Sequence, residues 1–432
     1  MMDRMRCMKN RLKKAVRCLV AGVLTAALSA GAVPMQAQAA PTPGLQEGPK
    51  AQAMKTKDEN ELRGVWISYL DWEKMSSNQT EYQAAVETQL QRCVNLKMNA
   101  VFVHVRPDAD AMYPSSYYPW SRFVTGTQGQ NPGYDPLAYF VKAAHNKGLQ
   151  FHAWVNPYRV TGYHNTWDQV SAASPAKKWL TDGDASNDRW VLKQNGAYYL
   201  NPAIPQVKEL ITNGVREIVQ NYDVDGIHFD DYFYPEVDDS DSSRWFDKPE
   251  YDASGSRMSI VNWRRENINS LIRSVYRTVK DAKPAVQFGI SPEGYVTHLR
   301  SENRLFADVD TWMSQDGYID YIMPQIYWGF EAKLSSGNPA PYAFENNLKT
   351  WIALKKRGNA RLYLGLAMYK TGSDTKDNNA VPEWLRYNDI MKRQVEAGRA
   401  SGEVAGYCFY AYSSFQEEAC QKEVEQLLRV FN

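Results

Sequence analysis

Two adjacent carboxylates, Asp230 and Asp231, stand in the middle of the stretch DGIHFDDYFYP. Apolar and polar residues alternate up to Asp230, as they do along a strand whose side chains point to opposite faces in turn. Acid/base cleavage of a glycosidic bond uses two carboxyl groups, one protonated and one ionised, about 5–10 Å apart. The stretch therefore predicts a strand that ends in catalytic carboxylates, with Asp230 as general acid or nucleophile and Asp231 setting its charge state.

The second catalytic carboxylate is expected at the end of a different strand, because adjacent residues of one strand rarely face the same substrate. Glu293, after the next strand, is predicted to be catalytic, and Asp108, after the second strand, is the alternative. Two carboxylates as close as the Asp pair repel each other, so one pKa is raised unless a cation compensates. Asp225, at the start of the strand, is interpreted as a structural residue.

Short apolar stretches recur along the chain, and each is followed by a polar loop and a helical pattern. Eight of them are typical of buried strands: 63–68, 100–105, 150–155, 225–229, 286–291, 320–325, 361–367 and 406–412. Apolar residues at helical spacing occur at 82–96, 136–149, 204–222, 259–281, 342–356, 383–398 and 417–431. Alternating strands and helices predict an α/β fold with a parallel sheet, and eight such units predict a (β/α)8 TIM barrel.

Long inserted loops are expected after strands 3 and 4 of this barrel, at 156–203 and 235–258. The first holds a predicted hairpin, in which WVLK and AYYL are joined through Asn195 and Gly196. An open doubly wound sheet is the alternative fold. It is disfavoured because the stretch YLDWEKM, after the first strand, contains no glycine-rich phosphate-binding turn.

Polar and aromatic residues follow six or seven of the eight strand ends, which is the face where a barrel builds its site. The arginines are predicted to anchor substrate oxygens or carboxylates, the amides to hydrogen-bond hydroxyl groups, and the rings to stack on sugars. The residues predicted to bind substrate are Arg106, Asp108, Asn156, Tyr158, Arg159, His228, Tyr232, Gln325, Tyr327 and Trp328.

The first 39 residues have the three parts of a secretory signal peptide, which are a basic start, a short apolar run and the small-residue site that ends at Ala39. Cleavage near Ala39 predicts a secreted, extracellular or cell-wall-associated protein. Residues 40–60 are expected to be a disordered leader, and 61–432 one catalytic domain. Removing a segment of net charge +6 from a chain of net charge +1 leaves −5, so neither nucleic acid nor, after cleavage, the membrane is a predicted partner.

Three cysteines remain in the mature chain, and their spacing fits neither a disulfide framework nor a metal site. His104, His152 and His228 lie in three consecutive predicted strands and could point inward. They keep a metal-dependent hydrolase or deacetylase open as a weaker alternative, although a hydrogen-bonded polar barrel floor accounts for them equally well. No metal and no cofactor is predicted.

Eight phrases in order resemble the glycosyl-hydrolase-like 10 family: ELRGVWIS, VFVHVRPDADAMYPS, FHAWVNPYRV, YLNPAIPQV, DVDGIHFDDYFYP, FGISPEGY, YIDYIMPQIYW and LYLGLAMYK. The resemblance implies an exported bacterial (β/α)8 barrel of the glycosidase type, acting on wall glycan or another polysaccharide. It also implies that the Asp pair and the RPDAD, NPYR and QIYW phrases face the cleft. Glu293 departs from the family pattern, which has an apolar or small residue after GISP, so the resemblance favours Asp108 over Glu293.

The sequence thus predicts a secreted glycoside hydrolase that cleaves O-glycosidic bonds in a bacterial cell-wall glycan or a related polysaccharide. Its partner would be a polysaccharide or oligosaccharide, with peptidoglycan glycan strands as one candidate. A non-catalytic glycan-binding barrel at the cell surface is the alternative, because the same rings and arginines would serve binding. The two adjacent acids favour the enzyme, since binding alone does not need them.

Overall fold

The computed structural model describes residues 61–162, 165–237, 245–355, 357–375 and 382–432. The predicted signal peptide at 1–39 and the predicted leader at 40–60 lie outside the described residues. Within the described ranges, none of the helices is both long and apolar enough to span a membrane. The three cysteines in these ranges are buried thiols, so no disulfide joins them.

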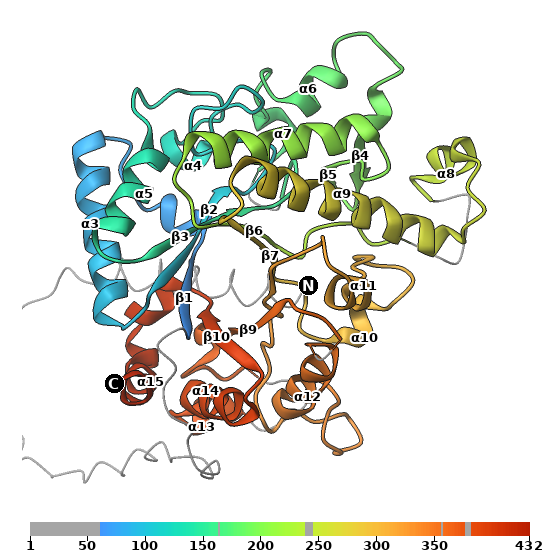
Figure 1. Ribbon diagram of the computed structural model, residues 1–432. Helices are drawn as coiled ribbons and strands as arrows, with labels where there is room; N and C mark the ends of the chain where they lie inside the picture. The colour runs from blue at the N-terminus through green and yellow to red at the C-terminus, as the bar shows by residue number, and fades with distance from the viewer. Residues whose placement is uncertain (1–60, 163–164, 238–244, 356, 376–381) are drawn as a thin grey trace, which may run out of the picture. The chain divides into compact units, whose positions relative to one another are not determined.

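Eight parallel strands close into a barrel (Figure 1). In barrel order they are β1 (Leu62–Ile67), β10 (Val404–Phe409), β9 (Arg361–Leu366), β8 (Tyr321–Ile322), β7 (Gln287–Ile290), β6 (Gly226–Phe229), β3 (Gln150–Val155) and β2 (Ala100–Arg106). Each strand overlaps one of the eight predicted stretches, and the predicted (β/α)8 barrel is therefore confirmed.

Helices surround the strands. The long ones are α3 (Gln79–Asn95), α5 (Pro136–Asn146), α7 (Pro205–Asn221), α9 (Ile260–Ala282), α12 (Phe344–Lys355), α14 (Ile390–Ser401) and α15 (Gln421–Phe431). Figure 1 shows α3 and α5 on one side of the barrel, α7 and α9 on another, and α14 and α15 on a third. Short helices α2 (Tyr69–Trp72), α4 (Arg122–Thr125), α10 (Val296–Leu299) and α11 (Val309–Ser314) lie in the connections.

The helix predicted at 383–398 is in fact two helices, α13 (Glu383–Arg386) and α14. Tyr387, the first residue after α13, is extended, with φ −112° and ψ 151°. The buried Glu383 carboxylate accepts the N–H groups of Phe330 and Glu331, from the loop after β8, at 2.9 Å each. This tertiary contact holds α13 against that loop. A helical pattern in the sequence does not reveal such a contact.

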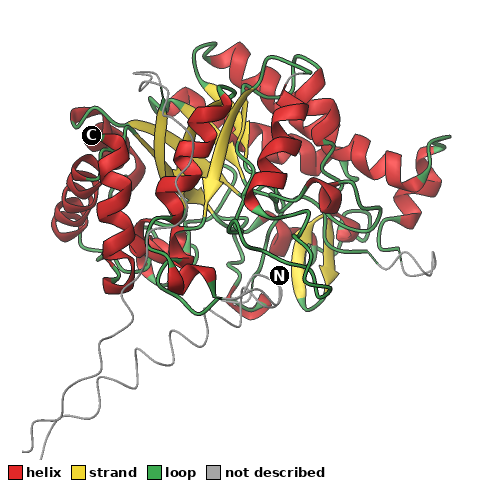
Figure 2. Ribbon diagram, turned by 90° about the horizontal axis from the view of Figure 1, so that it is seen from below, coloured by secondary structure: helices red, strands yellow, loops and turns green. Residues whose placement is uncertain are grey.

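The segment between β3 and α7 carries a two-stranded antiparallel sheet that lies apart from the barrel strands (Figure 2). Its strands are β4 (Val191–Gln194) and β5 (Ala197–Leu200), so the predicted hairpin is confirmed. The turn residues Asn195 and Gly196 have positive φ values of 51° and 80°, which the Asn-Gly pair adopts readily. The same segment contains α6 (Pro175–Trp179), and the segment between β6 and α9 contains α8 (Lys248–Ser254).

Aromatic side chains fill the barrel interior. One buried cluster there includes Trp66, Phe102, Trp154, Tyr321 and Tyr363. Glycines on neighbouring strands make room for large rings, because a Cβ on Gly226 would lie 2.2 Å from His152 Nδ1 and one on Gly289 would lie 2.2 Å from the Tyr321 ring. A packed interior leaves the ends of the strands as the place for a site.

At the amino-terminal end of the barrel, residues just before three strands accept an N–H of a neighbouring strand. The acceptors are Asn99, Asp225 and Asp320, and each hydrogen bond is 2.7 Å long. The N–H groups near the start of a strand lie at the end of the hydrogen-bond ladder between strands, so they need another partner when they are buried. The structural role predicted for Asp225 is confirmed by its bond from the Phe151 N–H.

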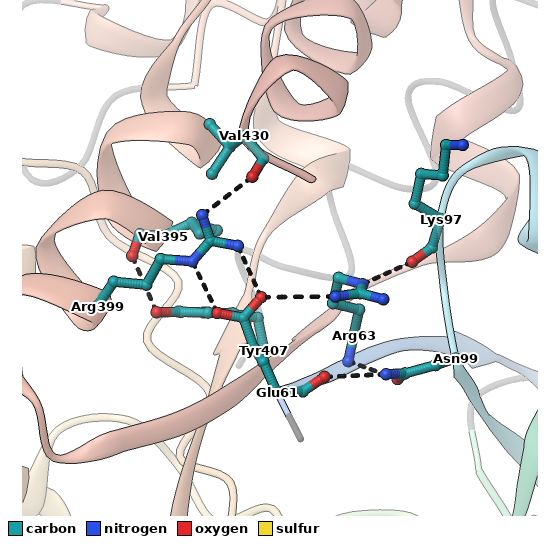
Figure 3. A network of polar contacts seen from close by, with 8 residues as sticks. All are labelled: Glu61, Arg63, Lys97, Asn99, Val395, Arg399, Tyr407 and Val430. Carbon is teal, nitrogen blue, oxygen red and sulfur yellow. Dashed lines mark hydrogen bonds and ion pairs between the residues drawn. The ribbon is translucent and has the colours of Figure 1, made fainter. Parts of the chain in front are cut away.

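A polar network joins the first strand to the last helices at this same end (Figure 3). Glu61, just before β1, accepts hydrogen bonds from Arg399 of α14 through Nε (2.7 Å) and Nη2 (2.8 Å). Arg399 Nη1 also donates to the Val430 carbonyl of α15 (3.0 Å). Tyr407 of β10 donates to the Val395 carbonyl of α14 (2.9 Å). These contacts hold the start of β1 against the C-terminal elements, where the barrel closes.

Candidate active site

Asp230 lies directly after β6, at the carboxyl-terminal end of the barrel, and is 6% exposed. Its Oδ1 accepts hydrogen bonds from Gln325 Nε2 (2.9 Å) and from the Asp231 main-chain N–H (2.8 Å). Gln325 also donates to the Ser291 carbonyl after β7 (2.8 Å), so three strand ends are joined here. Burial raises the pKa of Asp230, although the Asp231 N–H and the charge of Arg159 act in the opposite direction.

Arg159, in the loop after β3, links Asp230 electrostatically with a second buried carboxylate. Its Nε donates to Asp108 Oδ1 and to the Pro107 carbonyl, at 2.9 Å each, and its guanidinium lies 5.0 Å from the Tyr232 ring centre. Burial alone would lower the pKa of Arg159, but the charges of Asp108 and Asp230 help to raise it. Arg159 Nη2 is buried and has no hydrogen-bond acceptor among the described residues, so it is an unsatisfied donor.

Asp110 is a third buried carboxylate, in the same RPDAD phrase as Asp108. Its Oδ2 accepts from Gln128 Nε2 (2.9 Å), and Gln128 Oε1 accepts from the Ser171 N–H (2.7 Å) in the segment after β3. Burial, together with the charge of Asp108, raises the pKa of Asp110 to about 7. Asp110 is not among the residues predicted to bind substrate. Its position two residues after Asp108 is the signal that could have found it, because such residues share a face of an extended chain.

Arg106 points away from the site, which corrects the prediction that it faces the substrate. The ladder between β2 and β3 shifts register between His104 and Arg106, so Arg106 pairs with Val155 and takes the helix-facing side. Its guanidinium lies 4.5 Å from the Tyr118 ring centre. Its Nη1 would lie 2.6 Å from a Cβ on Gly214 of α7. Arg106 therefore packs between the barrel and its helices.

Two residues of the NPYR phrase are buried as well. Tyr158 is 1% exposed and belongs to the main hydrophobic core, so its ring has no face for a sugar, and burial raises its pKa. Asn156 is also 1% exposed and donates to the Pro107 carbonyl (3.0 Å), the same carbonyl that Arg159 binds. Asn156 thus fixes the loop that carries Asp108. Because Tyr158 and Asn156 are both buried, neither is placed to form the substrate contact that the sequence predicts.

Only the first of the three rings after Asp231 lies at the site. Tyr232 is partly exposed and stands beside Arg159, as its predicted role requires. The next two rings, Phe233 and Tyr234, are buried. Tyr234 donates to the buried carboxylate of Asp247 (2.9 Å), so these two rings anchor the loop rather than face a ligand.

His228 lies inside the packed barrel, two residues before Asp230. Trp66 Nε1 donates to His228 Nε2 (3.1 Å), which assigns the ring proton to Nδ1, facing the Tyr321 hydroxyl (3.1 Å). Burial lowers the pKa of His228 well below its usual value. His228 is 0% exposed. This corrects the prediction that it contacts substrate, because it is a neutral part of the barrel interior.

The other two strand histidines stack on rings. His104 lies on Trp154, with ring centres 3.7 Å apart, and His152 lies on Phe102, with ring centres 4.4 Å apart. Burial lowers the pKa of His152 to about 4. Among the residues that the structure describes, no three His, Cys, Asp or Glu side chains form a group that could hold a metal ion.

Three tyrosines from consecutive strand ends gather beside the carboxylates. The Tyr327 and Tyr410 rings are nearly parallel, with centres 6.2 Å apart, and each meets Tyr369 edge-on at 5.9 Å. Lys370 Nζ donates to the Tyr327 carbonyl, which fixes the turn after β8. Tyr369 and Tyr410 are partly exposed and were not among the predicted residues, although each follows a strand end.

Glu293 lies beside Gln325, and its two carboxylate oxygens are bound by the side chains of His298 and Arg304. Oε1 is 2.6 Å from His298 Nδ1, and Oε2 accepts from Arg304 Nη2 (2.8 Å). The Glu293 side chain is 9% exposed. The residue predicted to be the second catalytic group is thus an ion-paired carboxylate. Trp328, the last predicted contact, is partly exposed.

A (β/α)8 barrel that joins buried carboxylates, an arginine and partly exposed rings at the carboxyl ends of its strands has the architecture of glycoside hydrolases. The family model for "Glycosyl hydrolase-like 10" matches residues 61–385, and the chain belongs to this family. The predicted resemblance is confirmed.

Two curated relatives agree with this assignment. The chain is 37% identical over 366 residues to the glycosyl hydrolase YngK of Bacillus subtilis (strain 168), covering 80% of this chain and 68% of the relative. It is 34% identical over 412 residues to the glycosyl hydrolase DigH of Escherichia coli (strain K12), covering 88% and 89%. Family and fold together support a glycan-related hydrolase.

Solved structures show the same fold at low identity. The glycoside hydrolase domain of PgaB (BpsB) from Bordetella bronchiseptica matches with a TM-score of 0.57 and 14% identity, over 86% of this chain and 99% of that chain. A beta-galactosidase from the psychrophilic Marinomonas ef1 matches with a TM-score of 0.51 and 9% identity, over 85% and 59%. At such identities these structures support the fold alone.

Proposed function

We propose that this protein is a secreted glycoside hydrolase that cleaves O-glycosidic bonds in a bacterial cell-wall glycan or a related polysaccharide. The observation that carries the proposal is Asp230, a buried carboxyl group at the end of β6 whose pKa is raised by burial. A general acid must hold a proton near the working pH and give it to the leaving oxygen. Export rests on the basic and apolar start of the sequence.

In this proposal Asp230 protonates the glycosidic oxygen. Gln325 Nε2 and the Asp231 N–H hold its Oδ1 in place, so the other oxygen carries the proton toward the substrate. Arg159 Nη2 binds a substrate oxygen, and the partly exposed Tyr232 and Tyr410 supply ring faces.

The second carboxylate is the less defined part of the mechanism. Asp231 is partly exposed beside Asp230, whereas Asp108 is fully buried and bound by Arg159. Glu293 is bound by His298 and Arg304. Exposure favours Asp231 as the ionised partner that acts as base or nucleophile, because a catalytic group must reach the substrate. Both aspartates follow Phe229, the last residue of β6, so the alternation of a strand does not separate them.

The proposal is tested by incubating the chain without residues 1–39 with peptidoglycan, peptide-free wall glycan and chitin-type oligomers, and identifying products by mass. We expect shorter saccharides from at least one substrate and almost none from Asp230→Asn. No product from any substrate, or near-wild-type turnover by Asp230→Asn of unchanged melting temperature, would overturn it.

A non-catalytic glycan-binding barrel is the second candidate. It is favoured by the unsatisfied Arg159 Nη2 and by the rings, which serve binding as well as turnover. Its signature would be glycan binding without product, at an affinity that Asp230→Asn leaves unchanged.

A further inference from the structure

Four partly exposed side chains beside Glu293 have no part in the mechanism above. They are Tyr295, His298, Arg304 and Trp328, and we refer to them as the β7–β8 ledge. Tyr295 and His298 follow β7, Arg304 lies in the loop after α10, and Trp328 follows β8. The ledge combines two rings with the guanidinium of Arg304 and the imidazole of His298, groups suited to a sugar that carries a negative charge.

The ledge is joined to Asp230 through main-chain contacts. Glu293 and Gln325 pair as neighbouring strand ends, and the Gln325 N–H donates to the Pro292 carbonyl (2.9 Å). Gly294 allows this close approach, because a Cβ there would lie 2.3 Å from the Gln325 carbonyl oxygen. Gln325 is the residue that donates to Asp230, so the ledge begins next to the proposed acid.

The rings of the ledge share a buried support. Tyr342 is 9% exposed, and its ring centre lies 5.7 Å from that of Tyr295 and 5.5 Å from that of Trp328. Tyr342 packs among alanines of the loop between β8 and α12. Tyr295 and Trp328 are therefore held on one scaffold while part of each ring stays in contact with solvent.

The Glu293 carboxylate lies inside the ledge, and the two groups that bind it lie on its outer side. The Glu293 side chain is 9% exposed, whereas those of His298 and Arg304 are 44% and 33% exposed. A guanidinium has five N–H donors, and Arg304 uses Nη2 for Glu293. The outward side of this cluster thus presents further N–H donors of Arg304 next to the imidazole of His298.

The loop that carries Arg304 has an unusual backbone. Leu305 and Phe306, the next two residues, both have positive φ, at 60° and 50°, a conformation that non-glycine residues adopt at a cost. Phe306 is 0% exposed, with its ring centre 5.0 Å from that of Tyr234 and 5.2 Å from the Arg264 guanidinium. Packing of Phe306 in the core maintains the turn and so places Arg304 on Glu293.

We infer that the β7–β8 ledge is a subsite for a sugar unit that bears a carboxylate, bound next to the unit whose bond is cleaved. Tyr295 and Trp328 would contact the sugar ring, and Arg304, with His298, would bind the carboxylate. The inference rests on the proposed function, because it adds a specificity to the same site. The subsite would accept a uronic acid or a sugar with a carboxylate on an ether substituent, since both present a carboxylate to Arg304.

The test compares each acidic oligosaccharide with the same oligosaccharide after its carboxylates are reduced to alcohols. One pair contains uronic acids and the other contains ether-linked carboxylates from peptide-free wall glycan. We expect wild type to show a kcat/KM at least about 10-fold higher on the acidic member of one pair, because the reduced member cannot form the charge-assisted hydrogen bond with Arg304. Arg304→Met should reduce that preference to less than about 2-fold, with activity on the reduced member unchanged.

Arg300→Met is the matched control, because Arg300 is an exposed arginine of the same segment that pairs with Asp310 on α11 (2.7 Å through Nε and Nη2). It should keep the preference. A preference retained by Arg304→Met, or an equal loss on both members of a pair, would overturn the subsite. Arg304→Lys keeps the charge, so partial recovery of the preference separates binding from a folding defect.

Failure of the proposed function is distinguished by measuring binding as well as turnover. If neither member of a pair is cleaved, calorimetry still reports whether the acidic oligosaccharide binds more tightly. A preference in affinity that Arg304→Met removes supports the subsite in a binding protein. Equal affinity for acidic and reduced oligosaccharides overturns the subsite whether or not cleavage occurs.

Discussion

The two ends of the barrel place their carboxylates in different surroundings. At the amino-terminal end, Glu61 accepts two N–H groups of Arg399, and Asp320 accepts the Phe288 N–H together with Lys280 Nζ (2.7 Å each). Each of these acids has a cation of its own. The contacts join strands to strands and strands to helices, so they serve stability.

At the carboxyl-terminal end, acids outnumber the cations that face them. Asp108, Asp110 and Asp230 are all buried, and Arg159 is the cation that acts on both Asp108 and Asp230. Burial raises the pKa of Asp110 and of Asp230. Perturbed carboxyl groups gather where acid/base chemistry is done, which is what the difference between the two ends indicates.

The largest effect is expected from the two aspartates at opposite ends of β6. Asp230→Asn should lower kcat by about 10²- to 10⁴-fold, the usual contribution of a general acid. Asp225→Asn, which replaces an acid that binds the Phe151 N–H and His145, should lower the melting temperature but keep kcat. Steady-state kinetics and thermal unfolding of both variants measure this, and a similar loss of kcat in the two would break the comparison.

Arginines at the two ends provide the second contrast. Arg159→Met should lower kcat/KM by about 10- to 100-fold, which is the effect of losing one charge-assisted hydrogen bond to the substrate. It should also destabilise the fold by about 3–5 kcal/mol, because it leaves the buried Asp108 carboxylate without its cation. Arg399→Met should destabilise the fold by a similar amount, since it strands Glu61, which is 5% exposed, but it should leave kcat/KM unchanged. Unfolding in urea measures the stability of both variants, and kinetics at one pH measure their activity. Lost activity in Arg399→Met would contradict the division of roles.

Asp110 gives the comparison a pH dependence. Its folded-state pKa of about 7 lies above its ordinary value of 3.8, so the folded protein keeps a proton that the unfolded chain has lost. Stability from this group is complete below about pH 4 and is lost as the pH rises through 7. Asp110→Asn should therefore gain stability relative to wild type as the pH rises from 4 to 8, by at most about 4 kcal/mol. Melting curves across this range test it, and a difference that stays constant with pH would count against it.

The smallest effect is expected at Glu293. Because its two oxygens are bound by His298 and Arg304, Glu293→Gln should keep kcat within about 5-fold on a neutral glycan, far less than the loss expected for a general acid. Kinetics on a carboxyl-reduced oligosaccharide measure this without interference from the ledge. A loss as large as that of Asp230→Asn would restore Glu293 as the second catalytic group.

Much of the fold and part of the site could be predicted from the sequence. Short apolar stretches that alternate with helical patterns were sufficient for eight strands and their order along the chain, because each pattern depends only on local periodicity. The position of Asp230 at a strand end followed from the same periodicity. Arg159 and Gln325 were predicted as contacts, and the structure places both beside Asp230.

Side-chain direction was predicted less well. Arg106 follows the inward residues of β2 in sequence, but a register shift after His104 turns it outward. Phe233 and Tyr234 follow Tyr232 in the sequence, but unlike Tyr232 they are buried. A one-residue shift or a buried partner from another element leaves no trace in the local pattern.

The sequence by itself determined that the chain would form a barrel and that Asp230 would stand at the working end of a strand, since both depend on neighbours in the chain. Only the tertiary structure decided which groups surround that acid. Arg159 comes to it from the loop after β3, and Gln325 comes from the segment after β8. Asp108 is linked to the acid through Arg159. The raised pKa of Asp230 is a property of burial among these elements, because it arises from desolvation and from charges brought together by folding.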